Sequence, residues 1–319
     1  MKPIMKRYCL TPLRAIIALV IFFLTFTTTT LFYIIQFEVR QDKDILSAAV
    51  PRQPALTLLT FASHQADFLC RLLTSAVLNG ISVKVLGYDN NRKDPLFRKV
   101  TMTLAELKKR QPDEIIMFVD AFDVVITGNA ETIVSEFLQT KSDVVFAAEK
   151  GCWPFMDGRP EGEYICQQKY PESPTPYRYL NSGAWIGYAH AAVKAFEEMM
   201  ALPEAEKRAI DQELASIVFL NNQASITLDY HTRIFQCVHL SANDLQFQRR
   251  GGRTVVYNQI TKIYPPILHF NGNGKEVQEY YHERLGLISP RRSDIQKIQS
   301  TSADLVDGVV YSDICPKFH

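Results

Sequence analysis

The stretch that decides the fold is IIMFVDAFDVVI, from Ile115 to Ile126. An unbroken apolar run is followed by two aspartates, Asp120 and Asp123, and then by a second apolar run. Such a run is typical of a strand that is buried on both faces of a sheet. Two carboxylates this close repel each other unless a cation compensates, and hard divalent ions take oxygen ligands of this kind. We therefore predict a metal site here, although a lone D-x-x-D is also compatible with a turn cap and a solvated carboxylate.

The surrounding sequence alternates between short apolar runs and amphipathic stretches. This alternation predicts a parallel sheet with helices on both faces, and such sheets bind ligands at the carboxyl ends of their strands. After Gly151 the regularity weakens, and residues 159–177 are expected to form a long loop. The predicted strands are Leu56–Phe61, Ser82–Leu86, Glu114–Val119 and Val144–Ala148, and the predicted helices are Asp67–Leu78, Leu96–Arg110 and Ala130–Thr140.

Two further clusters strengthen the metal interpretation. In PPILHFNGNGK (Pro265–Lys275), a short apolar run ends in His269, Asn271, Gly272 and Lys275. Histidine can complete a carboxylate metal site, lysine can neutralise a phosphate, and glycine allows a ligand to approach the backbone. In LNSGAWIG (180–187), small hydrogen-bonding residues, including Asn181, could line a sugar pocket. Taken alone, these clusters could equally be a glycine-rich turn and a tight turn.

Composition limits the other classes of function. The 319 residues carry a net charge of +1, so no global field favours nucleic acid, and we expect no nucleic-acid partner. None of the six cysteines forms a C-x-x-C pair, which argues against a zinc ribbon. A disulfide between Cys152 and Cys166 and buried free thiols are both open interpretations.

Residues 15–37 form an uncharged apolar run, AIIALVIFFLTFTTTTLFYIIQF. A spanning helix needs about 20 such residues, whereas the core of a cleaved signal peptide has about 7–15. The charged residues before the run are all basic, so the positive-inside rule places the N-terminus in the cytosol. The expected organisation is a cytosolic tail (1–14), a transmembrane signal anchor (15–37), a stem (38–54), a globular domain (55–285) and a C-terminal extension (286–319).

Over residues 55–285 the chain resembles the glycosyltransferase domain of the procollagen lysyl hydroxylases. The resemblance implies a glycosyltransferase A-type α/β fold, Rossmann-like, with a mixed sheet and helices on both faces. It does not extend to a hydroxylase half, so we expect a standalone transferase domain on a membrane anchor. The matching pieces, in the family's order, are FASHQADFLCRLLTSA, IIMFVDAFDVVI, VVFAAEKGCWP, YLNSGAWIGYA, IDQELASIVFL, ITLDYHTRIFQ and LHFNGNGK.

The resemblance also implies roles for individual residues. The metal, Mn²⁺ in the family, would be held by Asp120, Asp123 and His269. The residues that bind the UDP-sugar donor would be Ser63, Phe122 and Lys275. Asn271 and Gly272, from the polar cluster after the apolar run, are further candidates for donor binding. Phe122 stands where the family has a tyrosine, so a stacking contact is kept and a hydroxyl contact is lost.

Three residues would act around the transferred sugar. By the same resemblance, Trp153 lies at the mouth of the sugar pocket and Asp211 near the reacting sugar, and Asn181 belongs to the same group. The acidic run of the family has shrunk to Asp211 followed by Gln212. Asp211 could be a general base or could orient the donor, and these roles imply different stereochemistry.

The expected activity is transfer of glucose or galactose from a UDP-sugar to an acceptor hydroxyl. The acceptor would be a glycan or protein, such as a hydroxylysine-linked glycan. The catalytic domain would lie in the lumen of the Golgi or endoplasmic reticulum, as part of a single-pass type II membrane protein. Two alternatives are a metal-dependent phosphoester hydrolase and a non-catalytic lumenal protein that binds sugar nucleotides.

Overall fold

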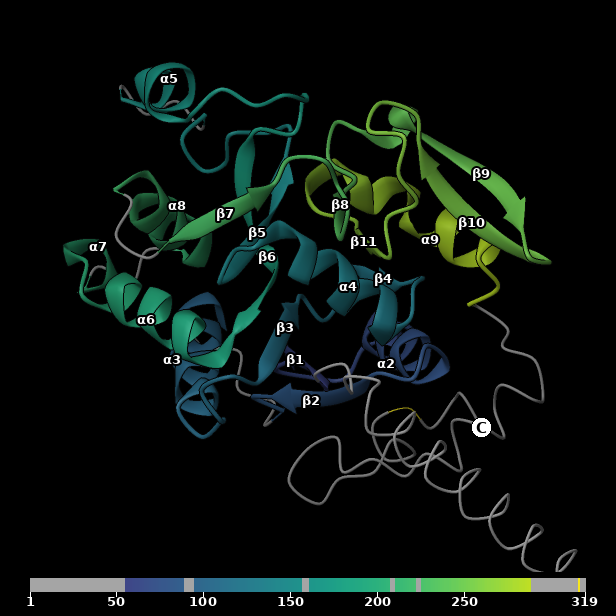
Figure 1. Ribbon diagram of the computed structural model, residues 1–319, viewed down its shortest axis with the longest axis horizontal. Helices are drawn as coiled ribbons and strands as arrows, with labels where there is room; N and C mark the ends of the chain where they lie inside the picture. The colour runs from purple at the N-terminus through teal and green to yellow at the C-terminus, as the bar shows by residue number, and fades with distance from the viewer. Residues whose placement is uncertain are drawn as a thin grey trace, which may run out of the picture. The chain divides into compact units, whose positions relative to one another are not determined.

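The computed structural model describes residues 55–88, 95–156, 161–206, 210–221, 225–287 and 315 (Figure 1). Its centre is a six-stranded sheet with the strand order β2-β1-β3-β6-β5-β7. Short apolar runs form most of its strands, because side chains on both faces are buried. The strands are β1 (Leu56–Phe61), β2 (Ser82–Leu86), β3 (Ile115–Val119), β5 (Val144–Glu149), β6 (Tyr179–Tyr188) and β7 (Ile226–Asp229).

The sheet is mixed, because β6 is antiparallel to both of its neighbours, β3 and β5. The pairs β1–β2, β1–β3 and β5–β7 are parallel. The mixed sheet implied by the family resemblance is confirmed, and the wholly parallel sheet predicted from alternation is wrong at β6. The pattern missed this strand because the small and polar residues Asn181, Ser182 and Gly183 interrupt its apolar run.

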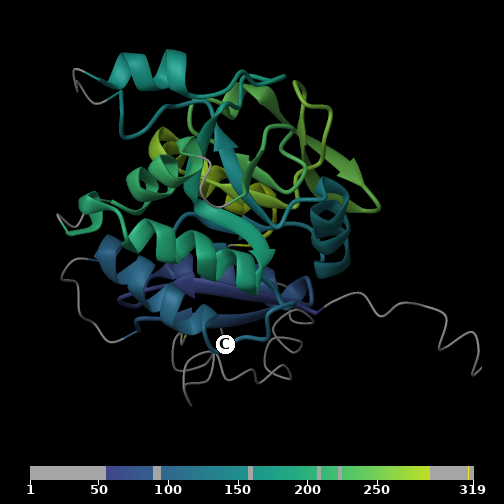
Figure 2. The same ribbon diagram turned by 60° about the vertical axis from the view of Figure 1, so that its left-hand side comes forward.

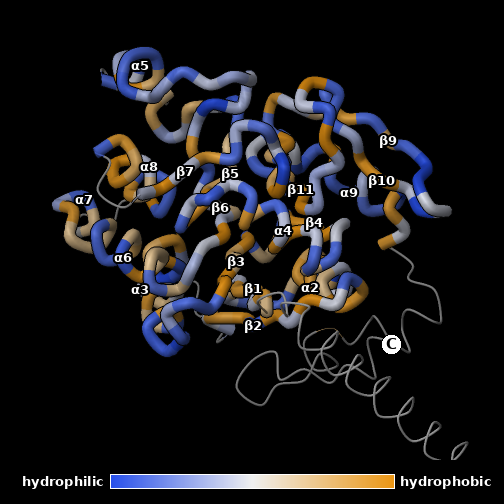
Figure 3. Tube along the Cα trace, in the orientation of Figure 1, coloured by the Kyte–Doolittle hydropathy of each residue, from blue (hydrophilic) through white to orange (hydrophobic). Residues whose placement is uncertain are grey.

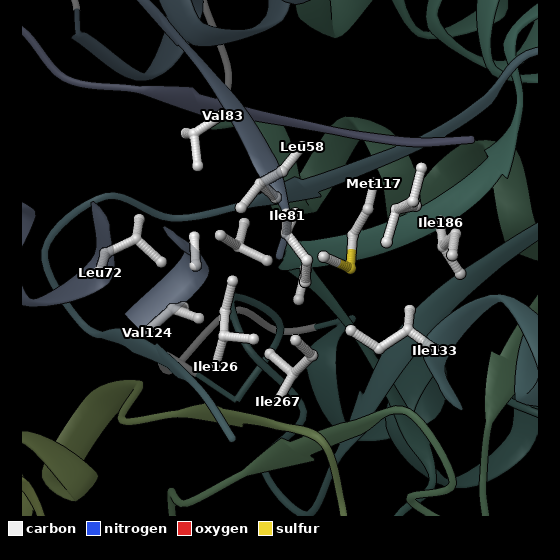
Figure 4. Packing of buried hydrophobic residues seen from close by; sticks show 14 of the residues in the cluster. Leu58, Leu72, Ile81, Val83, Met117, Val124, Ile126, Ile133, Ile186 and Ile267 are labelled. Atoms are coloured by element: carbon white, nitrogen blue, oxygen red, sulfur yellow. The ribbon is translucent and has the colours of Figure 1, made fainter. Parts of the chain in front are cut away.

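Helices cover both faces of this sheet (Figures 1 and 2). Successive residues of a strand point to opposite faces, so Met117 packs into one core and Phe118 into the other. The first core contains α2 (Asp67–Leu78) and α4 (Ala130–Thr140), and Figure 4 shows its packing around Met117. The second contains α3 (Pro95–Leu107), α6 (Ala189–Met200) and α8 (Asp211–Leu220). In Figure 3 the hydrophobic residues gather on the central strands and on the helix sides that face them.

A second, three-stranded sheet packs against the first core. It has the order β4-β11-β8, with β4 (Val124–Ile126), β8 (Phe235–Cys237) and β11 (Ile267–His269). Beside it lie the hairpin β9 (Leu245–Arg250) with β10 (Arg253–Asn258) and the helix α9 (Lys275–Arg284). The remaining short elements are α5 (Gly162–Tyr164), the π-helix η1 (Ile165–Lys169), α7 (Pro203–Glu206), and the 3₁₀ turns η2 (Ala242–Asp244) and η3 (Gly272–Gly274).

Most of the predicted elements have the predicted boundaries. Helices α2 and α4 match residue for residue, and the Asn129 side chain caps α4 by accepting from the Thr132 amide at 2.9 Å. Helix α3 ends at Leu107, three residues before the predicted end. The predicted loop at 159–177 contains α5 and η1.

Two disulfides are formed, Cys152–Cys166 and Cys70–Cys315. The disulfide interpretation of the first pair is therefore confirmed, while Cys237 is a buried free thiol. The predicted tail, anchor and stem (1–54) lie outside the described residues, as does most of the predicted extension at 286–319. Among the described helices, none combines the length and the apolar character that crossing a membrane requires.

Candidate metal centre and substrate cleft

Asp120 and Asp123 lie where the chain leaves the large sheet and enters the small one. Asp120 directly follows β3, and Asp123 directly precedes β4. The backbone on both sides is fixed, because the Asp120 amide donates to the Gly183 carbonyl at 2.8 Å and the Phe270 amide donates to the Asp123 carbonyl at 2.7 Å. The two carboxylates are thus held at the junction of two sheets.

His269, the last residue of β11, completes a three-residue cluster with these aspartates. One ligand atom from each residue lies within 4.8 Å of the others. The His269 Nε2 atom is 3.4 Å from an Asp123 oxygen and 3.8 Å from an Asp120 oxygen. It is buried and has no hydrogen-bond partner among the described residues. A buried nitrogen without a partner, facing two carboxylates, fits a divalent cation, and three protein ligands suit a single ion bridged by substrate oxygens.

The charges around this cluster depend on one another. Burial raises the pKa of Asp120 above its ordinary value, and nearby Asp123 adds to the rise. Burial also disfavours ionisation of Asp123, but His269 and Lys275 bring the pKa of that carboxyl below its ordinary value. For His269, burial opposes protonation, while the two aspartates raise the pKa above its ordinary value. The two carboxylates therefore stabilise a positive charge that lies between them.

Two lysines lie against the carboxylates. The Lys275 Nζ atom is 3.3 Å from Asp123, and its side chain is 63% exposed, so it can reach toward a ligand in the cleft. Lys99, in α3, is buried, and its Nζ atom lies 2.8 Å from Asp120 and 2.5 Å from Asp211. Sequence reasoning missed Lys99, because a lysine in an amphipathic helix is normally solvent-exposed.

Asp211 lies at the first turn of α8 and faces the same cleft. Its Oδ2 atom accepts from the Ser182 hydroxyl at 2.6 Å and pairs with Lys99. Both contacts use the same oxygen, and no described residue forms a hydrogen bond or ion pair with the other one. The structure thus brings Asp211 to the metal cluster through the Lys99 ammonium, which bridges Asp211 and Asp120.

Glu149, the last residue of β5, is the centre of a buried amide network. It accepts from Asn181 at 2.9 Å, from Gln212 at 2.8 Å and from Asn271 at 2.7 Å. Burial raises the pKa of Glu149 above its ordinary value. Gln212 also donates to the Trp153 carbonyl at 3.1 Å, which connects the network to the rim of the cleft. The sequence predicted site residues just after Ala148, where Glu149 lies, but it assigned no role to this carboxylate.

An irregularity in β6 shapes this part of the site. The register between β5 and β6 shifts, so that Phe146 pairs with Trp185 but the next residue, Ala147, pairs with Asn181. The residues in between, which include Gly183, bulge toward the metal cluster. A Cβ atom on Gly183 would lie 2.3 Å from His269 Cε1 and 2.5 Å from an Asp120 oxygen, so the close approach requires glycine.

These residues line a common cleft of about 490 Å³. Trp153, 47% exposed, lies at its rim. Of the residues predicted for metal, catalysis and donor binding, the cleft is lined by Asp120, Asp123, Trp153, Asn181, Asp211, His269, Asn271, Gly272 and Lys275.

Comparison with known proteins identifies the family. Residues 52–286 match the family model described as PLOD GT domain. The chain belongs to this glycosyltransferase-domain family. It is 29% identical over 258 residues to the "Multifunctional procollagen lysine hydroxylase and glycosyltransferase" of Caenorhabditis elegans, covering 76% of this chain and 34% of that protein.

Two further matches also cover most of this chain and only part of the matched protein. The chain is 32% identical over 249 residues to the mouse "Procollagen-lysine,2-oxoglutarate 5-dioxygenase 1", covering 74% of this chain and 32% of the relative. It therefore spans about a third of the length of these curated relatives. Among solved structures, the WbbM bifunctional glycosyltransferase is similar at a TM-score of 0.44 and 14% identity, over 78% of this chain and 52% of that one.

Two residues that the family resemblance assigned to the donor form a group with His64. Ser63 and Phe122 are not among the residues that line the cleft. Ser63 is 3.1 Å from the His64 Nδ1 atom, and the His64 ring packs on Phe122 with a centroid distance of 4.9 Å. Ser63 and His64 follow β1, and Phe122 follows β3. Because Phe122 lies between Asp120 and Asp123 in the sequence, this group of three residues lies next to the metal cluster.

Proposed function

We propose that this chain is a metal-dependent hexosyltransferase, which moves glucose or galactose from a UDP-sugar to an acceptor hydroxyl. The observation that carries the proposal is the cluster of Asp120, Asp123 and His269 in the cleft of a PLOD GT-family domain. The buried Nε2 atom of His269 faces both carboxylates without a hydrogen bond to any described residue. Both the sequence motifs and the geometry of the cluster support these three residues as ligands.

A divalent cation such as Mn²⁺, when bound, would neutralise the charge that develops on the departing diphosphate. The chain's own contribution begins with Lys275. Its exposed ammonium lies beside Asp123, so it would supply a second positive charge to a diphosphate bound in the cleft. Asp123, His269 and Lys275, which lie beside β4 and β11, would thus hold the charged end of the donor.

On the opposite side, Asp211 is held by Lys99 and Ser182 through one oxygen. A carboxylate that is fixed in this way is a directed hydrogen-bond acceptor, which suits orientation of the donor sugar's hydroxyls. We infer that Lys99 maintains the distance between Asp211 and the metal ligand Asp120. Trp153 would form an apolar wall for the sugar, and Asn181, whose amide donates to Glu149 and Gln212, would hold the wall of the pocket in shape.

The remaining donor contacts are inferred from the resemblance. Gly272 has a φ of 51° and lies on the cleft, where the backbone is open to a phosphate or ribose. Asn271 uses its amide to hold Glu149, and its role would be to fix this turn. Ser63 and Phe122 would contact the nucleoside, with Phe122 stacking on the base.

We further propose that residues 15–37 anchor the protein as a type II membrane protein, with the catalytic domain in the Golgi or endoplasmic reticulum lumen. Two disulfides in the globular domain support an oxidising compartment. The acceptor would be a hydroxyl on a protein or glycan. The names of the relatives, which combine lysine hydroxylation of procollagen with glycosyl transfer, favour a hydroxylysine-linked glycan.

The test is release of UDP from a panel of UDP-sugars by the full-length chain, with and without Mn²⁺. We expect turnover of UDP-glucose or UDP-galactose only with metal. Asp123→Ala should abolish metal-dependent UDP binding and leave the unfolding temperature close to that of the wild type. Glu136→Ala, which removes a surface carboxylate that pairs with Arg233, is the control and should bind UDP normally.

Other outcomes would point to the alternatives. Hydrolysis of simple phosphoesters, without a preference for UDP-sugars, would favour a hydrolase. Tight UDP-sugar binding without any turnover would favour a binding protein. If neither binding nor turnover were observed, the proposed function would be wrong.

A further inference from the structure

The imidazole of His269 has a second nitrogen, and its environment is unusual. Nε2 faces Asp120 and Asp123, whereas Nδ1 points to the Cys237 sulfur at 4.0 Å. The contact follows from strand register, because β8 and β11 are parallel and pair Cys237 directly with His269. Sequence alone did not connect these residues.

Cys237 is the partner that the structure offers to this nitrogen. On the other side of β11, the residue paired with His269 is the apolar Val124. Among the described residues, no hydrogen bond of Nδ1 other than that to Cys237 is formed. The thiol is fully buried, and it is free while four other cysteines form disulfides.

A histidine that binds a metal through Nε2 must carry its proton on Nδ1, and that N–H needs an acceptor that also fixes the ring. Carboxylates and carbonyls usually fill this role, and the sulfur of a thiol is a weaker acceptor. At His269 the ring is packed too tightly against Gly183 for a larger adjustment, since even a methyl group on Gly183 would collide with it. The neighbour of Nδ1 therefore decides how the ring is held.

We propose that Cys237 is a positioning residue for the metal centre: its sulfur accepts the Nδ1–H hydrogen bond of His269 and keeps Nε2 directed at the cation. The inference rests on the metal site of the proposed function and adds to it a residue outside the cleft. Because no bond to the cation is involved, the thiol acts only through the histidine.

Because a thiol is a weak acceptor, the Mn²⁺ affinity should depend on which group replaces it. Cys237→Val fills a similar space with no acceptor, whereas Cys237→Asn supplies an amide oxygen. Loss of such a partner typically lowers metal affinity about 10–100-fold. We expect this decrease for Cys237→Val, and we expect Cys237→Asn to bind Mn²⁺ within about threefold of the wild type or more tightly. Cys237→Ala, a smaller change, serves if the valine variant does not fold.

The test is a Mn²⁺ titration of the full-length chain by calorimetry, together with thermal unfolding in the absence of metal. Ile267→Val is the matched control, because it trims the same strand two residues before His269 and leaves the Nδ1 contact intact. It should lower the unfolding temperature slightly, because it removes one buried methyl group, and leave Mn²⁺ affinity unchanged.

The outcomes separate the inference from the proposed function. If the wild type binds Mn²⁺ and Cys237→Val binds it equally well, the positioning role is wrong and the metal site stands. If the valine variant and the Ile267→Val control weaken binding to the same extent, the effect is general loosening of the strand and the positioning role is again wrong. Absence of Mn²⁺ binding by the wild type would overturn both the metal site and this inference.

Discussion

Replacing Gly183 by alanine should disable the metal centre without removing any of its ligands. A Cβ atom at this position would lie 2.3 Å from His269 Cε1, 2.9 Å from His269 Nε2 and 2.5 Å from an Asp120 oxygen. Non-bonded carbon atoms are at their optimum about 3.5–4.0 Å apart. The histidine ring or the β6 backbone must therefore move by more than about 1 Å.

That displacement can be compared with the tolerance of a metal site. Ligand distances in such sites vary by about 0.2 Å, so a shift of more than about 1 Å removes His269, Asp120 or both from the ion. We expect Mn²⁺ affinity to fall at least about 100-fold, with loss of UDP release. The strain should also lower the free energy of unfolding by about 1–3 kcal/mol, as is typical of overpacked cores.

The assays are Mn²⁺ titration and UDP release, with thermal unfolding to measure stability. Gly187→Ala is the matched control: it lies on the same strand, and its Cβ would crowd the Asp143 carbonyl at 2.7 Å, away from the metal ligands. It should lose stability and keep Mn²⁺ affinity. A folded Gly183→Ala protein that binds Mn²⁺ as tightly as the wild type would refute the reasoning.

Two further predictions concern buried charges. Lys99→Met leaves Asp120 and Asp211 without their shared ammonium, so UDP release should fall at least about 100-fold while Mn²⁺ still binds; unchanged turnover would contradict the bridging role. Burial and a neighbouring guanidinium lower the pKa of His282 to about 4, so the unfolded chain takes up a proton below its ordinary pKa of about 6.5 and the folded chain does not until about 4. Stability should therefore decrease by up to about 3 kcal/mol as pH falls through this window. Chemical denaturation at a series of pH values should show a flatter dependence for His282→Gln, and equal slopes would refute this assignment.

The sequence predicted best those features that are local. Leu56–Phe61 and Asp67–Leu78 have the expected boundaries, because apolar period and length determine a strand or a helix within one stretch. The three residues of the candidate metal cluster could also be selected from the sequence, since Asp120 and His269 each follow or end an apolar run. In both cases a short window of sequence contains the whole signal.

Features that depend on neighbours in space were not predictable in this way. The direction of β6 depends on which strands flank it, and the burial of Lys99 depends on where α3 lies relative to Asp211. The partner of His269 depends on the register between β8 and β11. Each of these requires long-range pairing, which a pattern of residue types does not encode.

The pairing of β4 with β11 has a consequence for how the protein matures. Asp120 and Asp123 are synthesised in the first half of the chain, but β11 and His269 are added in its last quarter. Non-local strand pairs of this kind form late, because the intervening chain must first be closed into a loop. A partly synthesised or partly folded chain therefore has two carboxylates but no complete set of ligands. The proposed site can take up an ion only when β11 is in place, so metal binding would report that β11 has paired with β4.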